Sequence, residues 1–325
     1  MREQIRRTLG GVGRSLVTAG TLILLFVAYQ LWGTGVFTAQ EQDRLKAQFE
    51  HQLAAAPTTT APSTTTTGTK PRKPPASPPT IIGNKITPPA DGAPIGVIHM
   101  PWSDYVVVEG TTRDDLKKGP GHYPATVFPG QLGNAGIAGH RTTYLHPFFD
   151  LDTMKVGDII KVDMLWGKFR YRVVDTFDGL PNPHPVRPSD TGVVEQLADK
   201  TKGWLTLTTC NPKYSAAERL VLRAQLIVDA AQPPKPYLKP ATESLSKPGT
   251  LANENQQLRD GLDGAAASKG PAVWWGIVML LVGALWWWVY RHWRHPLTWF
   301  AGLIPFVPVL IAFYYFLERS LPAGY

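Results

Sequence analysis

Three long runs of uncharged, mainly apolar residues set the strongest limit on the fold of this chain. They cover residues 16–37, 272–290 and 297–317. An α-helix rises about 1.5 Å per residue, so a run of about 20 residues can cross a bilayer core of about 30 Å. The sequence therefore predicts a membrane protein whose water-exposed part lies between the first run and the second.

Basic residues beside these runs predict their orientation. A segment of residues 1–15 precedes the first run, and a short loop of residues 291–296 separates the last two. Cytoplasmic loops carry an excess of Lys and Arg, so we expect both segments inside, the part between the first two runs outside, and the tail of residues 318–325 outside. A cleaved signal peptide is the alternative for the first run, although the run is longer than a usual signal core. The arginines before the first run are Arg2, Arg6, Arg7 and Arg14.

The part between the membrane runs divides by composition. Residues 38–93 include a stretch at 57–79 made almost wholly of Thr, Pro, Ala and Ser with a few Lys and Arg, which has too few apolar residues to form a core. This bias is typical of an extended stalk. Residues 230–271 are polar and predict a second linker. The globular domain is therefore expected at residues 94–229.

Short β-prone runs separated by Gly and Pro fill residues 94–229. Such spacing predicts an all-β barrel or sandwich, with short helices only at residues 112–117 and 189–200. The predicted strands lie at residues 95–99, 105–109, 137–140, 158–164, 168–177, 204–210 and 220–228.

The charge distribution argues against a nucleic-acid partner. The chain has 33 Lys and Arg and 25 Asp and Glu, a net charge of +8. Residues 94–229 hold 15 of each sign, so the whole excess lies in the termini and linkers. A neutral domain lacks the basic surface of a nucleic-acid binder.

Cys210 is the only cysteine, so the chain forms no internal disulfide. A single thiol in an extracellular domain invites a functional explanation, although free cysteines are also often buried apolar residues. Cys210 ends a strand of alternating apolar and hydroxyl residues, and Pro212 then interrupts that strand. Cys210 is therefore a candidate nucleophile, which requires a base or a cation nearby.

His140 and Arg219 are the candidate partners of Cys210. Five histidines lie in the domain, and His140 differs from the others because it ends an apolar, Gly-rich strand. Arg219 follows Cys210 by nine residues and opens the next strand. Consecutive antiparallel strands place the end of one near the start of the next, so we expect Arg219 close to Cys210. Its guanidinium is suited to a substrate carbonyl or an oxyanion. The other four histidines are His99, His122, His146 and His184.

These residues stand in motifs that resemble the sortase family. Thr206-Leu-Thr-Thr-Cys210 followed by Arg219 resembles the cysteine motif, and Gly139-His-Arg141 resembles the histidine motif. The likeness covers residues 95–228 and is greatest to actinobacterial class E sortases, as in His140-Arg-Thr-Thr-Tyr144. Asn211 departs from that class, which more often has His there. The resemblance implies an eight-stranded sortase-type β-barrel.

The resemblance also implies a cysteine transpeptidase. Cys210 would attack the bond between Thr and Gly of an LAxTG or LPxTG sorting signal on a surface protein, and an amine of a peptidoglycan precursor would resolve the thioester. His140 would protonate the leaving amine, and Arg219 would hold carbonyl oxygens. Substrate contacts are expected from Tyr144, Thr142, Thr208 and Thr209, with Tyr144 associated with Ala in place of Pro. No metal or cofactor is expected, and membrane lipid is an expected partner.

Three other functions are compatible with these residues. A pilus-polymerising sortase would use a pilin lysine as its acceptor, but residues 81–91 contain no obvious lid with an Asp-aromatic pair. A binding or scaffold domain would need no reactive thiol. A cysteine peptidase would release its product to water and not to an amine.

Overall fold

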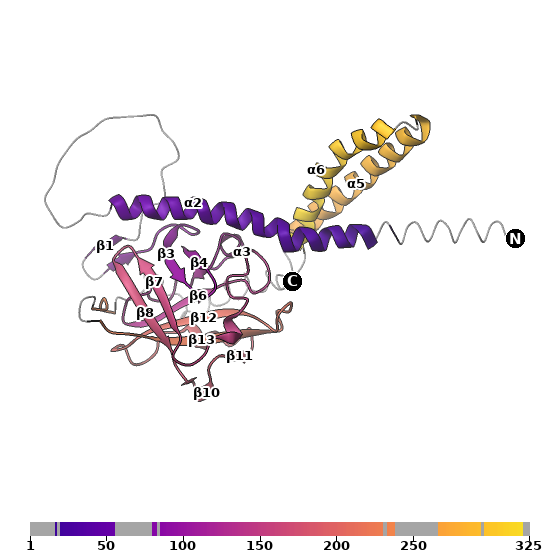
Figure 1. Cartoon of the computed structure of the whole chain (residues 1–325). Coiled ribbons are helices and arrows are strands. Elements are labelled where there is room, and N and C mark those ends of the chain that lie inside the picture. Colours follow the sequence, from indigo (N-terminus) through magenta and orange to yellow (C-terminus); the bar gives the residue numbers. More distant parts are fainter. Residues whose placement is uncertain are drawn as a thin grey trace, which may run out of the picture. The chain divides into compact units, whose positions relative to one another are not determined.

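The structure is a computed structural model that describes residues 17, 20–55, 80–82, 85–229, 233–237, 266–293 and 296–320. The chain divides into two compact units, one of residues 35–258 with the C-terminal pair 324–325 and one of residues 1–34 and 259–323. We call them the barrel unit and the helical unit, and each is described by itself (Figure 1). Residues 321–325 of the predicted tail and most of the linker at 230–271 lie outside the described residues, whereas residues 318–320 of that tail end the last helix.

Eight strands of the barrel unit close into a barrel. The order around it is β13, β12, β6, β5, β4, β3, β7 and β8, and β8 pairs back with β13. Two neighbouring pairs are parallel, β4 with β5 and β6 with β12, and the others are antiparallel. The predicted eight-stranded all-β barrel is therefore confirmed. Its strands are β3 (Pro94–His99), β4 (Asp104–Glu109), β5 (Gly121–His122), β6 (Gly133–Ala138), β7 (Ile159–Met164), β8 (Gly167–Val173), β12 (Gly203–Asn211) and β13 (Glu218–Leu226).

Smaller elements surround the barrel. β11 (His184–Val186) extends the sheet beyond β13, and two short hairpins are formed by β1 (Thr80–Ile82) with β2 (Lys85–Thr87) and by β9 (Thr176–Phe177) with β10 (Leu180–Pro181). The first predicted helix appears as α3 (Arg113–Leu116). The helix predicted at residues 189–200 is reduced to a 3₁₀ turn, η3 (Thr191–Val194), and a second turn, η2 (Leu151–Thr153), follows β6.

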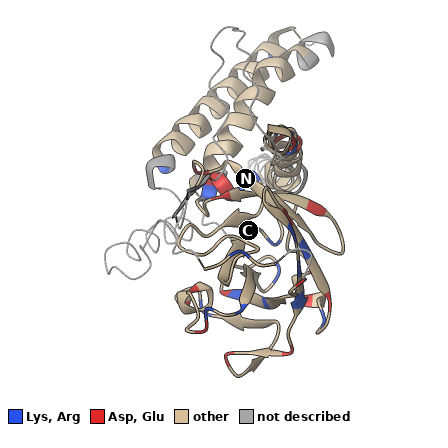
Figure 2. Ribbon diagram, turned by 90° about the vertical axis from the view of Figure 1, so that its left-hand side faces the viewer, with Lys and Arg blue, Asp and Glu red and all other residues tan. Residues whose placement is uncertain are grey.

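The barrel core follows the alternation of the strands. In β8, Phe169, Tyr171 and Val173 are buried while the residues between them face out. β12 and β13 are buried along most of their length, because neighbouring segments cover their outer face as well. Lys and Arg positions are interspersed with Asp and Glu over the barrel in Figure 2, in keeping with the neutral charge of residues 94–229. The largest fully buried apolar side chains are Ile95, Ile98, Ile137, Phe148, Leu151, Ile160, Tyr171, Leu205, Leu207 and Leu222.

Helix α2 (Thr34–Ala55) corrects the predicted stalk. Residues 38–55 were assigned to that stalk, but they are helical and pack on the barrel. Strand β5 is only two residues long and pairs with the end of β4, so the backbone of Val106 has no strand neighbour on that side. Gln42 takes the neighbour's place: its Oε1 accepts from Val106 N at 2.7 Å and its Nε2 donates to Val106 O at 3.0 Å and to Lys118 O at 2.7 Å. Leu45 packs beside it against Val106 and Val108. The Thr/Pro-rich residues 57–79 lie outside the described residues.

Two long helices dominate the helical unit, α5 (Ala266–Trp293) and α6 (Pro296–Ser320). Among the described residues, only 269–293 of α5 are long and apolar enough to cross a membrane, with a mean hydropathy of 1.8; the apolar part of α6, Ala301–Leu317, is shorter. The predicted run at 272–290 lies inside α5. Tyr314 of α6 is buried and donates its hydroxyl to Leu22 O at 2.7 Å. The segment before η1 (Tyr29–Gly33) therefore packs on α6.

Candidate active site

The site forms where three neighbouring strands meet at one end of the barrel. Thr208 of β12 lies opposite Ala138 in the parallel β6–β12 pair, so the C-terminal ends of both strands lie together. Cys210 is near the end of β12, and His140 follows β6 by two residues. Cys210 lies opposite Arg219 in the antiparallel β12–β13 pair. The barrel topology thus brings Cys210, His140 and Arg219 to the same edge.

Gly139 fixes the backbone of the histidine segment against β12. Its N–H donates to Thr208 O at 3.0 Å, and its carbonyl accepts from Thr209 Oγ1 at 2.7 Å. A Cβ at this position would lie 2.6 Å from the ring of Phe148, which is fully buried. Glycine therefore lets the backbone pass between β12 and Phe148, and His140, the next residue, lies beside the strand that carries Cys210.

His140 is held in a half-buried setting that disfavours its charged form. Its ring lies against Tyr144, with centroids 4.9 Å apart, and its Nε2 is buried without a hydrogen-bond partner among the described residues. Burial, followed by the positive charges of Lys117, Arg113 and Arg219, lowers the pKa of His140 to about 4. The imidazole is therefore neutral near pH 7.

Cys210 is partly exposed, unlike a cysteine that only fills the core. Its carbonyl accepts from Arg141 Nη1 at 3.1 Å. Arg219 is also partly exposed, and its Nη1 donates to the carbonyls of Ala216 at 3.1 Å and Glu218 at 3.0 Å. These bonds hold the guanidinium at the start of β13, beside the end of β12.

Tyr144 and the threonines occupy mixed positions. Tyr144 is buried between His140 and the ammonium of Lys117, which lies 5.7 Å from its ring, and its backbone is left-handed with φ of 53°. The hydroxyl of Thr208 bonds Tyr123 at 2.9 Å, and that of Thr209 bonds Gly139 O. Both side chains are buried and both hydroxyls are already bonded, which favours a structural role for them. Thr142 is half-buried beside the same loop.

The remaining histidines have other settings. His122 is fully buried and contacts Glu109 Oε2 at 2.9 Å through Nδ1 and Val127 O at 3.0 Å through Nε2. His99 pairs with Asp104 at 2.8 Å, His184 contacts Pro181 O at 2.9 Å, and His146 is exposed. Across the part of the chain that the structure describes, no three His, Cys, Asp or Glu residues are grouped so that they could hold a metal.

Arg141 stands in the histidine motif, but the motif implied no role for it in this site. Its side chain is 3% exposed and contacts both Cys210 and Asn211. The signal that could have found it is a charged residue directly after a buried strand, where burial requires polar partners.

Comparisons with known proteins agree with the motifs. Residues 98–227 match the family model described as "Sortase domain". The chain is 28% identical to sortase SrtE1 of Streptomyces coelicolor over 226 residues, which are 66% of this chain and 56% of that protein. It is 32% identical to sortase D of Bacillus subtilis over 126 residues, 38% of this chain and 58% of that protein. The chain thus spans a little over half the length of these two relatives.

One solved structure is also similar in sequence to this chain. Sortase E from Streptomyces avermitilis is 33% identical, and the match covers 50% of this chain and 99% of that one, with a TM-score of 0.38.

Proposed function

We propose that this chain, whose residues 98–227 belong to the sortase domain family, is a membrane-anchored cysteine transpeptidase that acts on surface proteins. One observation carries the proposal: Cys210, His140 and Arg219 stand at the same end of three neighbouring strands. A nucleophile, a proton carrier and an oxyanion donor are the groups that acyl transfer through a thioester requires.

The reaction begins with the Cys210 thiol and a neutral His140. As sulfur attacks the carbonyl carbon between Thr and Gly of the sorting signal, the thiol proton moves to the imidazole. Arg219 donates to the oxyanion of the tetrahedral intermediate. When the C–N bond breaks, the imidazolium returns the proton to the leaving amine and a thioester remains. The low pKa of His140 favours this return, because the charged ring is an acidic donor.

An amine then resolves the thioester. It attacks the thioester carbonyl, its proton passes through His140 to the departing sulfur, and a new amide bond forms. We propose the amine of a peptidoglycan precursor as the acceptor. This fits a barrel outside the membrane, with residues 1–15 and 291–296 inside and three spans at 16–37, 272–290 and 297–317 in contact with lipid. The span within α5 has outward-facing apolar side chains such as Trp274, Leu281 and Trp288 that suit such contact.

Tyr144 is proposed to favour Ala over Pro at the second position of the sorting signal. Pro lacks an N–H and fixes φ, whereas an Ala peptide can donate a hydrogen bond at that position. The Tyr144 phenol can accept one, and the contact between its ring and the His140 ring supports this proposal.

The test uses the full-length chain in detergent with LAxTG and LPxTG peptides, with and without an amine acceptor. We expect an amide product that forms with the acceptor, is lost in Cys210→Ala and His140→Ala, and forms faster from the LAxTG peptide. Product that forms only with water would indicate a peptidase, and full activity in either variant would refute the assignment. A peptide preference unchanged in Tyr144→Phe and Tyr144→Ala would remove Tyr144 as its cause.

A further inference from the structure

The sequence neighbours of the three proposed catalytic residues are bonded to one another. Arg141 follows His140, Asn211 follows Cys210, and Glu218 precedes Arg219. Their side chains form a continuous series of contacts that runs from the histidine segment to the start of β13. None of these three side chains has a role in the proposed reaction, so their connection asks for a separate explanation.

Arg141 makes the buried part of this series. Its Nη1 donates to Cys210 O at 3.1 Å and to Asn211 Oδ1 at 2.7 Å, and its Nη2 pairs with Asp152 Oδ2 at 3.0 Å. The Arg141 side chain is 3% exposed, whereas that of its partner Asp152 is 43% exposed, so the guanidinium is buried but its ion pair reaches the surface. The planar guanidinium holds Cys210 O, Asn211 and Asp152 at fixed angles, which an ammonium cannot reproduce.

Asn211 joins Arg141 to the strand that carries Arg219. Its Oδ1 accepts from Arg141, and its Nδ2 donates to Glu218 Oε2 at 2.8 Å. Glu218 in turn accepts from Arg219 Nη1 through its backbone carbonyl at 3.0 Å. An amide side chain can accept and donate at once, which is what this position needs.

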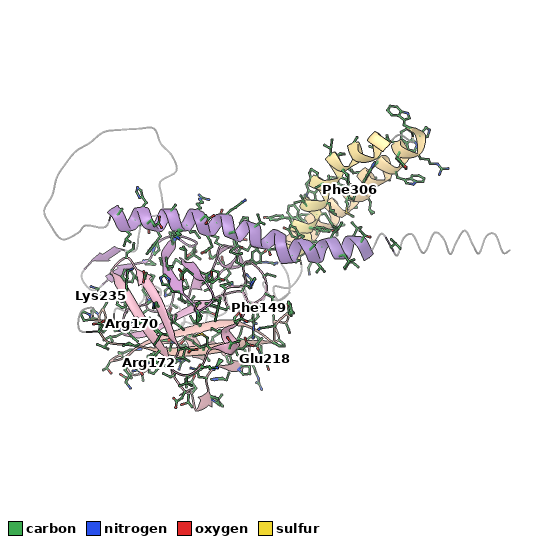
Figure 3. All side chains as sticks on the ribbon, in the orientation of Figure 1. Phe149, Arg170, Arg172, Glu218, Lys235 and Phe306 are labelled. Carbon is green, nitrogen blue, oxygen red and sulfur yellow. The ribbon has the colours of Figure 1, made fainter. Side chains whose placement is uncertain are left out.

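A second set of contacts holds the same two loops together. Lys213, in the loop between β12 and β13, lies 3.5 Å from Asp152 and 3.4 Å from Asp150, and its ammonium sits 4.0 Å from the ring centre of Phe149. Phe149 and Glu218 can be found in the side-chain view of Figure 3. Asp152 thus contacts both Arg141 and Lys213, and the loop after His140 is tied to the loop after Cys210 at two points.

We propose that Asp152, Arg141, Asn211 and Glu218 form a positioning chain that sets Cys210 and Arg219 relative to His140. The inference rests on the proposed transpeptidase function. The side chains of Asp152, Arg141, Asn211 and Glu218 touch no reacting atom in the proposed reaction. They act through the backbone of Cys210 and through the loop before Arg219. A displacement of about 1 Å at a reacting group can cost about 100-fold in rate, so such a chain affects turnover without contributing to the chemistry.

Arg223 provides a matched control for Arg141. It is also 3% exposed, its Nη1 pairs with the half-exposed Asp178 at 3.3 Å, and its Nε donates to Thr206 Oγ1 at 3.3 Å. Thr206 lies on the same strand as Cys210, four residues earlier. Replacing either arginine therefore removes a buried guanidinium that is bonded to β12, but only Arg141 is bonded to Cys210.

The experiment compares the full-length chain in detergent with its variants Arg141→Lys, Asn211→Ala, Glu218→Ala and Arg223→Lys. For Arg141→Lys we expect kcat to fall about 10- to 100-fold with KM within about twofold. Smaller losses are expected for Asn211→Ala, and the smallest for Glu218→Ala, because the contact between Asn211 and Glu218 is exposed. Arg223→Lys should lower the melting temperature about as much as Arg141→Lys does, while its kcat stays within about twofold of wild type. Equal kcat losses in the two arginine variants would overturn the proposal.

A readout that needs no peptide separates this inference from the proposed function. Hydrogen exchange of backbone amides is measured in segments 141–146 and 211–218. Asn211→Ala should speed exchange in both segments, and Arg223→Lys in neither. If exchange in segment 141–146 does not respond to Asn211→Ala, the four residues do not form a connected positioning chain. If exchange responds but kcat is unchanged, the positioning chain exists but does not position the site. If the wild-type protein turns over no peptide, only the proposed function is refuted. The hydrogen-exchange comparison still tests whether the positioning chain connects the two loops.

Discussion

Gly139→Ala tests whether the close passage beside Phe148 places His140. The added methyl carbon would lie 2.6, 2.8 and 3.2 Å from three atoms of the Phe148 ring. Neither side can yield easily, because Phe148 is fully buried and both polar backbone groups of Gly139 are bonded to β12. Such overpacking costs about 1–3 kcal/mol. Alanine also lowers the conformational entropy of the unfolded chain, and this offsets about 0.4–1 kcal/mol of the loss in unfolding free energy.

The net expectation is a loss of about 1–2 kcal/mol in unfolding free energy. The backbone can relieve the clash only by moving away from Phe148, and this would displace His140, the next residue. We therefore expect kcat to fall about 10- to 100-fold, a larger effect than the stability loss alone would give at a temperature where the variant is folded.

Denaturant unfolding and peptide transfer by the full-length chain check both numbers. Gly192→Ala is the matched control, since a Cβ there meets nothing within 4 Å. In a Phe148→Leu background the cost of Gly139→Ala should shrink, because the ring that it meets is gone. Equal behaviour of Gly139→Ala and Gly192→Ala, or strict additivity with Phe148→Leu, would refute the reasoning.

Three further outcomes follow from contacts in the barrel unit. Gln42→Ala removes three hydrogen bonds to the backbone and should lower the free energy of unfolding by denaturant by about 2–3 kcal/mol. Gln40 is exposed on the same helix, so Gln40→Ala should change it by less than about 0.5 kcal/mol. Equal effects would mean that Gln42 does not hold α2 on the barrel. Glu109→Ala removes the carboxylate partner of the buried His122 and should lower the unfolding free energy by about 3–5 kcal/mol. Asp104→Ala, which removes a partner of the more exposed His99, should lower it by less than about 1 kcal/mol. A larger loss for Asp104→Ala would contradict the buried pairing. The pKa of His140 is lowered to about 4 on folding, so the unfolded chain binds more protons between pH 4 and pH 6.5. The stability that His140 contributes is complete above pH 6.5 and is lost as pH falls toward 4. His140→Gln should therefore reduce the dependence of the unfolding free energy on pH in this range. An unchanged pH dependence would place the pKa of His140 near its ordinary value.

The sequence predicts strands better than it predicts what packs on them. Alternation identifies β7 and β8, where buried and exposed residues follow each other closely. It misses β5, because two residues are too few to show a period. It also misses α2, since Thr38 and Gln42 contact the barrel at positions where an apolar residue would have revealed the helix. Those polar residues are there because the barrel offers them backbone groups, and no local pattern records this.

Of the candidate site, the part that hairpin geometry determines was predictable. Cys210 and Arg219 lie on consecutive antiparallel strands, and they are opposite each other as expected. His140 reaches them through the parallel β6–β12 pair, which joins strands that lie far apart in the sequence. Spacing alone cannot predict such a pairing, and its placement came from the resemblance. Arg141 was missed because its partners, Cys210 O and Asn211, are revealed only when that pairing exists.

The strand directions explain why chemistry and recognition can vary separately at this site. Two parallel strands, β6 and β12, end where the antiparallel β13 begins, so residues at these three ends are fixed by the register of the barrel. The loops that leave the same ends, residues 141–152 and 212–217, are not part of that register. A change in the loops can alter what binds without moving Cys210 or His140, provided that the contacts of Arg141 and Asn211 persist. Substitutions of loop residues outside the positioning chain should therefore change KM and peptide preference, whereas substitutions of Arg141, Asn211, Asp152 or Glu218 should change kcat.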